Sequence, residues 1–151
     1  MRDTTQSRQP PQQTQVAIIG AGFGGLAMAI RLLQNNIQDF VILEKANDVG
    51  GTWRENQYPG AACDVQSHMY SLSFIPKSDW SKRYADAAEI FAYIHSLTQK
   101  YDLKKYCEFN CEVLAAEYNQ QSCDWKLTLN NDTTLMAQFV VFASGPLHVP
   151  Q

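Results

Sequence analysis

Three glycines near the start of the chain have a spacing that suits the binding of a pyrophosphate. Gly20, Gly22 and Gly25 form the pattern G-x-G-x-x-G directly after the apolar run 16–19. We expect Gly20 to permit a tight strand-to-helix turn, Gly22 to let the backbone approach a phosphate, and Gly25 to let the helix pack closely. Gly24 should add conformational freedom, because glycine tolerates positive φ. The free N–H groups of the helix N-terminus would then face the phosphates.

An acidic residue stands where such sites hold a ribose. Glu44 ends a second apolar run, 40–43, and lies 19 residues after Gly25, close to the roughly 20-residue offset of a ribose-binding carboxylate. A carboxylate there can accept hydrogen bonds from both adenosine ribose hydroxyls and would repel a 2′-phosphate, so we do not expect NADP at this first site. The glycine pattern alone could be a flexible loop. Strand, glycines, helix and acid together favour a dinucleotide site.

The apolar periodicity predicts an α/β arrangement that positions these residues. The segments 15–19 and 39–44 have the continuous apolar character of parallel strands that are buried on both faces. A helix from about residue 24 to residue 35 joins them, and its apolar residues recur at helical spacing. The long, poorly periodic stretch 54–84 follows. Such stretches are usually functional in a compact domain, although a surface loop with anchoring aromatics is the alternative.

A second helix is predicted over residues 87–101. Asp86 can cap its N-terminus, and Glu89 stands three residues later, as in a capping box. The residues Ile90, Ile94, Leu97 and Tyr101 form its apolar stripe. His95 lies beside that stripe, and we expect it to be structural or on the surface rather than catalytic.

Alternating apolar and polar residues after this helix predict a small antiparallel meander. The alternation covers 111–116 and 125–130, with turn residues at 119–122 and 130–132. The run 139–143 then predicts a further buried strand. The Gly145-Pro146 pair that follows could lie beside a cofactor or could be only a turn.

The composition indicates one soluble domain. The chain has 151 residues and a formal net charge of −3, which suggests neither a nucleic-acid partner nor an anionic membrane surface. No apolar run approaches the roughly 20 residues needed to cross a bilayer. Residues 1–14 are expected to be a disordered N-terminal segment without a secretory signal, which predicts a cytoplasmic protein. Residues 15–151 are expected to form the domain.

Four cysteines are present, Cys63, Cys107, Cys111 and Cys123. None forms a C-x-x-C pair, and without a secretory signal we expect reduced thiols. Cys107 and Cys111 could be argued into a metal site, but buried strand cysteines are the better interpretation. We therefore expect no metal.

The chain resembles the N-terminal part of class B flavin-dependent monooxygenases, and above all the Baeyer–Villiger type and its near relatives. The resemblance covers nearly everything from Gln15 onward and rests on four stretches: the turn 20–25; Glu44 followed by Gly50-Gly51-Thr52-Trp53; Tyr58-Pro59-Gly60-Ala61-Ala62-Cys63-Asp64-Val65 with Tyr70-Ser71-Leu72-Ser73-Phe74; and Phe142-Ala143-Ser144-Gly145-Pro146. The second and third stretches are more specific than the glycine turn.

The resemblance implies a Rossmann-like FAD/NAD(P)-binding fold and a set of residue roles. Glu44 would bind the adenosine ribose of FAD, and Asp64 would place a carboxylate near the isoalloxazine and nicotinamide as the one catalytic residue. The alternative for Asp64 is a loop aspartate that caps a backbone N–H. The remaining roles are the flavin side of the site for Gly51, Thr52 and Trp53, packing by the flavin for Tyr70, and a backbone contact to adenine for Val113. The expected cofactor contacts are Gly20, Gly22, Gly24, Gly25, Glu44, Lys45, Gly51, Thr52, Trp53, Asp64, Val65, Tyr70, Val113 and Gly145.

The implied activity is NADPH- and O2-dependent oxygenation of a small organic substrate. A Baeyer–Villiger reaction converts a ketone to an ester or lactone. An enzyme that oxygenates nitrogen or sulfur, or a non-catalytic FAD-binding remnant, are the alternatives. The family's NADPH domain and C-terminal section have no counterpart before Gln151, so the chain is expected to be a truncated part of such an enzyme. Two departures from the family pattern, Gln66 for a proline and His148 for a small residue, affect only details.

Overall fold

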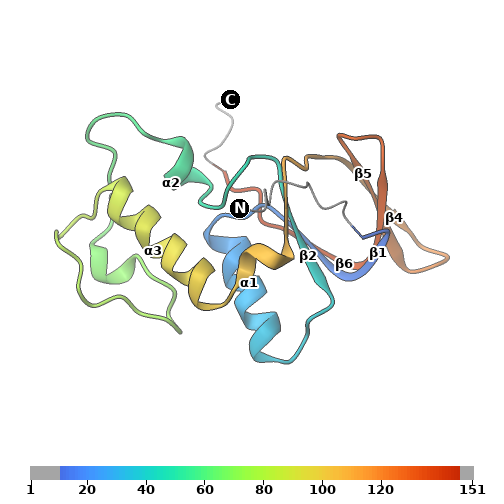
Figure 1. Ribbon diagram of the computed structural model, residues 1–151, viewed down its shortest axis with the longest axis horizontal. Helices are drawn as coiled ribbons and strands as arrows, with labels where there is room; N and C mark the ends of the chain where they lie inside the picture. The colour runs from blue at the N-terminus through green and yellow to red at the C-terminus, as the bar shows by residue number, and fades with distance from the viewer. Residues whose placement is uncertain (1–10, 147–151) are drawn as a thin grey trace, which may run out of the picture.

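The computed structural model describes residues 11–146, which form a six-stranded sheet with the helices beside it (Figure 1). The strands are β1 (Gln13–Ile19), β2 (Phe40–Glu44), β3 (Cys107–Phe109), β4 (Val113–Asn119), β5 (Asp124–Leu129) and β6 (Thr134–Phe142). The helices are α1 (Phe23–Gln34), α2 (Thr52–Glu55) and α3 (Ala87–Lys100), with the short 3₁₀ turns η1 (Ser67–Met69) and η2 (Leu103–Tyr106).

The sheet is parallel at one side and antiparallel at the other. Its strand order is β3-β2-β1-β6-β5-β4. β1 pairs in parallel with β2 and β6, and β2 pairs in parallel with β3. β4, β5 and β6 form an antiparallel meander. The predicted parallel strands and meander are confirmed, and β6 joins both parts into one Rossmann-like sheet.

The two predicted parallel strands are buried on both faces, as their apolar runs indicate. All five residues of β2 are buried.

β1 begins at Gln13, so the prediction that residues 13 and 14 belong to a disordered segment is wrong. Thr14 is buried, and its hydroxyl donates to Asp39 Oδ1 at 2.9 Å. The reason is tertiary, because Gln13 and Thr14 pair with Met136 and Ala137 of the distant strand β6. Residues 1–10 of that predicted segment lie outside the described part, as does His148.

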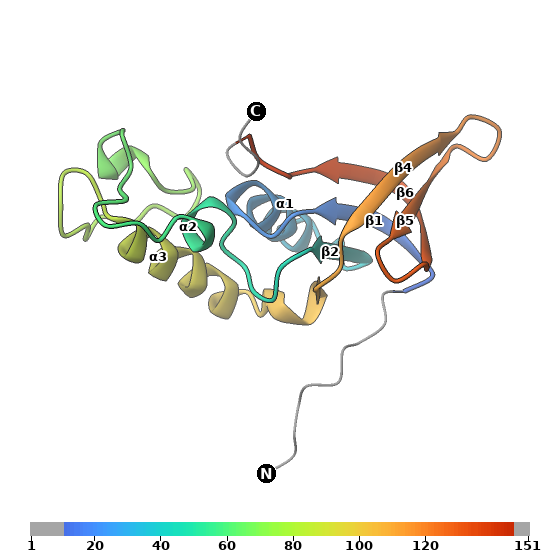
Figure 2. The ribbon, with the colours of Figure 1, turned by 90° about the horizontal axis from the view of Figure 1, so that it is seen from above.

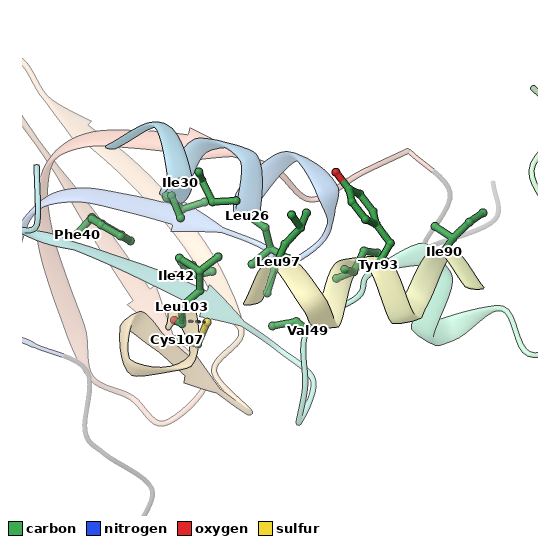
Figure 3. Close-up of a cluster of buried hydrophobic side chains, with 14 of the residues drawn as sticks. Leu26, Ile30, Phe40, Ile42, Val49, Ile90, Tyr93, Leu97, Leu103 and Cys107 are labelled. Atoms are coloured by element: carbon green, nitrogen blue, oxygen red, sulfur yellow. Dashed lines mark hydrogen bonds between the residues drawn. The ribbon is translucent and has the colours of Figure 1, made fainter. Parts of the chain in front are cut away.

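The main core lies between the sheet and the helices α1 and α3 (Figure 3). Alternate strand residues such as Ile18 and Ile42 point to this side, where they meet apolar residues of both helices. The buried side chains that Figure 3 labels are Leu26, Ile30, Phe40, Ile42, Val49, Ile90, Tyr93, Leu97, Leu103 and Cys107. Both predicted apolar stripes therefore face one shared core.

The meander covers the other face of the parallel strands. Ala17, Val41 and Leu43 point away from the helices and form a second buried cluster. The meander side chains in this cluster are Leu127, Leu129, Leu135 and Ala137. Figure 2 shows β4 and β5 running obliquely to β1 and β6, which lets them cover this face. The parallel strands are thus sandwiched, which is why they can be apolar on both sides.

The helix ends follow from local chemistry. Asn36, just after α1, has a φ of 60°, and asparagine tolerates this left-handed conformation. The Asp86 side chain accepts from the Glu89 N–H at 2.9 Å and caps α3 as predicted. The Glu89 side chain does not complete the expected capping box. It accepts from the Ser81 N–H at 3.0 Å and from the Ser81 hydroxyl at 2.7 Å.

The strands differ from the expectations in two places. No range is predicted for β3, because three residues are too few to show a period, although the expectation that Cys107, its first residue, is a buried strand cysteine is confirmed. The run 139–143 is part of a strand but is not buried, since Phe139 and Phe142 are each 60% exposed. β5 pairs only with the segment Thr134–Ala137 of β6, so among residues 11–146 the rest of β6 has a neighbouring strand on the β1 side alone.

The predicted irregular stretch 54–84 is confirmed, and the buried Tyr93 side chain connects it to α3 by hydrogen bonds. The Tyr93 hydroxyl donates to the Ile75 carbonyl at 2.6 Å and accepts from the Leu72 N–H at 3.1 Å. The Arg31 guanidinium lies 3.7 Å from the centre of the Phe74 ring, which attaches the same stretch to α1. The stretch is therefore anchored to both helices.

All four cysteines have free thiols. Cys63, Cys107 and Cys111 are buried and Cys123 is exposed. Burial raises the pKa of Cys107 to about 12 and that of Cys111 to about 11. Cys111 lies between β3 and β4 rather than in a strand. Between residues 11 and 146, no helix has the length and apolar character to cross a membrane.

Ile94 on α3 is fully buried in the main core, so the effect of shortening its side chain can be predicted. Replacing Ile94 with Ala should lower the free energy of unfolding by about 2–5 kcal/mol, because it removes buried methyl groups and leaves a cavity. The matched control is Leu114→Ala on β4, where the side chain is 60% exposed, and its effect should stay within about 0.5 kcal/mol. Urea denaturation followed by circular dichroism measures both. Equal losses in the two variants would contradict this description of the core.

Candidate functional site

The glycine turn connects the end of β1 to the start of α1 and leaves no room for side chains at two positions. Gly20 has a φ of 103°, and a Cβ there would lie 2.6 Å from the Ala143 carbonyl oxygen. A Cβ on Gly25 would lie 1.9 Å from the Gly20 carbonyl oxygen. The turn therefore requires glycine at both positions, as predicted. The expectation for Gly24 is wrong, because Gly24 lies within α1 without positive φ, and a Cβ there would make only an ordinary 3.7 Å contact with Ala143.

The N-terminus of α1 is suited to an anion. Gly22 is the N-cap residue, so no side-chain hydrogen bond caps the helix. The first turn contains no acidic residue. The first N–H groups of a helix have no partner within it, and the helix dipole adds partial positive charge at this end. These N–H groups can receive a phosphate.

A second pair of glycines packs against the first turn. Gly51 has a φ of 53°, and a Cβ on it would lie 3.1 Å from the Gly22 Cα atom. Gly50 has a φ of 126°, and its N–H donates to the Ala21 carbonyl at 3.0 Å. A Cβ on Gly50 would lie 2.5 Å from the Phe91 ring of α3. The two glycine loops thus meet backbone to backbone, and the second is pressed against α3.

The Glu44 carboxylate lies beneath these loops, and the residue is only 5% exposed. Its Oε2 atom accepts from the Ala21 N–H at 2.7 Å, and its Oε1 atom accepts from the Ala46 N–H at 3.0 Å. An ionised carboxylate offers about four acceptor sites. Glu44 therefore holds the glycine turn in place and retains about two acceptor sites for a ligand. The sequence reasoning predicted the ribose role and missed this structural one.

A further residue that sequence reasoning missed is Arg54 at the end of α2. Its guanidinium donates to the Asp48 carbonyl and to the Glu55 carboxylate, and its Nη1 atom lies 3.7 Å from Glu44 Oε1. The side chain is 12% exposed. The only available signal was its place directly after Gly-Gly-Thr-Trp.

Asp48 anchors the second glycine loop to the helical layer. Its carboxylate lies 2.9 Å from Lys104 Nζ and 3.4 Å from His95 Nε2. Burial alone would raise the pKa of Asp48, but the Lys104 ammonium, the Val49 N–H and His95 together hold it below its usual value. His95 also packs edge-on against Phe91, with the ring centres 4.5 Å apart. These contacts agree with a structural His95.

Three aromatic side chains stand together beside the glycine loops. The Trp53 indole N–H donates to the Tyr70 hydroxyl at 3.1 Å, and the two rings are perpendicular with centres 5.3 Å apart. Phe23, the first residue of α1, packs edge-on against Tyr70 at 5.6 Å. Burial raises the pKa of the Tyr70 hydroxyl. The predicted flavin-side residues Trp53 and Tyr70 are thus in contact with each other, and Tyr70 also contacts Phe23 of the glycine turn.

The other predicted site residues lie nearer the surface. Lys45, Asp64, Val65 and Gly145 are exposed, whereas Thr52 and Val113 are partly buried. The Ala46 carbonyl accepts from the Asn110 N–H at 2.9 Å and the Glu44 carbonyl from the Cys111 N–H at 2.9 Å, which brings the start of β4 close to Glu44. After burial, the charge of Asp64 is one of the smaller causes of the raised pKa of Tyr70.

Most of these groups gather at one edge of the sheet because β1, β2 and β6 are parallel. Their carboxyl ends meet there, and ligands of open α/β sheets bind at such an edge. In the described part of the chain, His, Cys, Asp and Glu side chains form no group of three that could hold a metal ion. The arrangement offers hydrogen-bond donors for phosphate, acceptors for ribose hydroxyls and aromatic rings for a planar ligand.

Comparison with known proteins agrees with this geometry. A family model described as an NAD(P)-binding Rossmann-like domain matches residues 18–88. A Baeyer–Villiger monooxygenase of Streptomyces coelicolor is 42% identical over 143 residues, which are 95% of this chain and 27% of that protein. The FAD-binding monooxygenase tazF of Aspergillus terreus is 46% identical over 125 residues, which are 81% of this chain and 22% of that protein.

A solved structure is similar over nearly the whole of this chain. Cyclohexanone monooxygenase from Rhodococcus sp. Phi1, bound to NADP+, matches with a TM-score of 0.86 at 32% identity, covering 94% of this chain and 28% of its own. The chain belongs to the class B flavin monooxygenases, as their FAD-binding Rossmann-like part. It spans about a quarter of the length of the curated relatives that it matches. The monooxygenase resemblance of the sequence is thereby confirmed.

The glycine turn allows a matched pair of substitutions. Gly25→Ala should lower the free energy of unfolding by about 3 kcal/mol or more, because its Cβ would overlap the Gly20 carbonyl oxygen and the backbone would have to move. Gly24→Ala, one position earlier in the same helix, meets only an ordinary contact and should be neutral or stabilising by up to about 1 kcal/mol. Chemical denaturation monitored by circular dichroism distinguishes them. A Gly24→Ala variant as unstable as Gly25→Ala would show that this turn is described wrongly.

Proposed function

We propose that this chain forms the FAD-binding part of an NADPH- and O2-dependent monooxygenase of the Baeyer–Villiger type, which converts a ketone to an ester or lactone. The similarity to Baeyer–Villiger monooxygenases supports the reaction class. Similar solved structures include cyclohexanone monooxygenase with bound cyclohexanone and OTEMO in complex with FAD and NADP. These relatives support a ketone substrate and this pair of cofactors.

The observation that carries the FAD proposal is the meeting of the two glycine loops at the uncapped N-terminus of α1. A Cβ on Gly51 would approach the Gly22 Cα to 3.1 Å, so only hydrogen atoms separate the two backbones. Neither glycine contributes a side chain beside the uncapped N–H groups of α1, which fits a pyrophosphate. Glu44 lies at the end of the next strand, where the adenosine ribose would follow.

The residues present fit the other parts of FAD. Each Glu44 oxygen already accepts one backbone N–H, so one further acceptor site on each oxygen can receive one of the two ribose hydroxyls. Trp53 and Tyr70 hold each other at right angles and would pack beside the flavin. Asp64 would act electrostatically near the reacting atoms. FAD, when bound, supplies the redox chemistry, whereas these side chains supply position and charge.

The site can be tested with Gly22→Asp in the full-length protein. The added carboxylate would occupy the position that a phosphate must approach and would repel it, so we expect loss of FAD. The measurement is flavin absorbance that co-elutes with the purified protein. The control is Gln121→Asp, which adds the same charge on the exposed β4–β5 turn and should leave the FAD content unchanged. Stoichiometric FAD in the Gly22→Asp variant would refute the proposed pyrophosphate site.

A second prediction concerns the 151-residue chain by itself. Between Thr52 and Gln151 the sequence contains only Gly60 and Gly145, so no second G-x-G-x-x-G pattern is present for NADPH. Hydride transfer requires the nicotinamide to be held against the flavin, and an unheld donor loses most of the proximity advantage. With FAD added, the chain should therefore oxidise NADPH no faster than free FAD does. Saturable, NADPH-specific oxidation, measured as loss of absorbance at the NADPH band, would contradict this.

A further inference from the structure

Arg54 and Glu44 form a largely buried ion pair at the proposed ribose site. Their side chains are 12% and 7% exposed, and the guanidinium Nη1 lies 3.7 Å from the carboxylate Oε1. This distance exceeds that of a normal hydrogen bond. The attraction is therefore mainly coulombic, and it does not occupy the acceptor sites that remain on Glu44.

The position of Arg54 is fixed by other contacts. Its backbone N–H donates to the Gly51 carbonyl at 3.0 Å, so it lies one helical turn after the glycine that contacts Gly22. Its guanidinium donates to the Asp48 carbonyl and to Glu55. A Cβ on Gly50 would lie 2.9 Å from the Arg54 Cβ, so the stem of the side chain runs over that glycine. Arg54 is thus held beside Glu44 without any contribution from a ligand.

We propose that Arg54 is a positioning residue for the cofactor, which compensates the charge of Glu44 when the adenosine ribose covers it. A ligand ribose would remove the remaining water from a carboxylate that is already mostly buried. Burying an anion is costly unless a cation or hydrogen bonds compensate it. The two backbone N–H groups supply part of this compensation, and the Arg54 guanidinium supplies the charge. The inference rests on the proposed FAD site.

A double-mutant cycle tests whether Arg54 acts through Glu44. In the full-length apoprotein, Arg54→Met removes the charge and keeps most of the stem, and it should raise the Kd for FAD about tenfold. Glu44→Gln should also raise the Kd by about tenfold or more, because it replaces charge-assisted hydrogen bonds by neutral ones. In the Glu44→Gln background, Arg54→Met should change the Kd by less than about twofold, since no carboxylate remains to be compensated. Flavin fluorescence titration measures all four values.

Two further variants separate charge from structure. Arg54→Lys keeps the charge and should keep the Kd within about threefold of the wild type, because the contact with Glu44 is coulombic. Lys126→Met removes a cation from the exposed face of β5, away from both glycine loops, and should leave the Kd within about twofold. If Arg54→Met does not fold, the Kd of Arg54→Lys still tests the proposal. A Kd within about threefold of the wild type supports it, and a larger increase overturns it.

The outcomes distinguish the proposals. If Arg54→Met causes a similar loss with and without the Glu44→Gln substitution, the positioning role is overturned and FAD binding is left intact. An Arg54→Lys loss as large as that of Arg54→Met, or no loss from either, would overturn the role in the same way. A wild-type protein that does not bind FAD would refute the proposed function itself, and this inference with it.

Discussion

The buried carboxylate of Glu44 links the parts of the site. It receives N–H groups from Ala21 in the glycine turn and from Ala46 after β2, and it lies beside the Arg54 guanidinium. A buried anion requires each of these partners, because an uncompensated charge in the interior is costly. The end of β2, the glycine turn 20–25 and the second glycine loop are therefore held in one arrangement. The groups proposed to bind pyrophosphate and ribose cannot move independently of one another.

The helical layer also holds the second glycine loop in place. Gly50 lies directly against the Phe91 ring, and Asp48 pairs with Lys104. Both contacts belong to the side of the sheet where α1 and α3 share a core. The second glycine loop has little regular structure of its own, so its place opposite Gly22 depends on how α3 packs. Substitutions in the helical core should for this reason affect the cofactor site as well as stability.

The proposed binding half of the site is more deeply buried than the proposed catalytic half. Glu44 is enclosed by backbone and helix contacts, whereas Asp64 is exposed on the irregular stretch. The backbone around Asp64 is nevertheless held, because the N–H groups of Cys63 and Ser67 donate to the carbonyls of Ala85 and Arg83. In relatives, about three quarters of the polypeptide lies outside the region matched by this chain. The catalytic role of Asp64 therefore remains a prediction from the resemblance.

The sequence by itself determined the parallel strands β1 and β2, the glycine turn, the carboxylate at the end of β2 and the cap of α3. Each depends on spacing or periodicity within a short segment, which can be recognised in the sequence without knowledge of the fold. Only the tertiary structure decided that Gly51 meets Gly22, that Arg54 lies beside Glu44, and that Phe139 is exposed. These features arise from pairing between distant segments. The exposure of a strand residue depends on which strands and helices cover it, and the type of the residue does not show which elements these are.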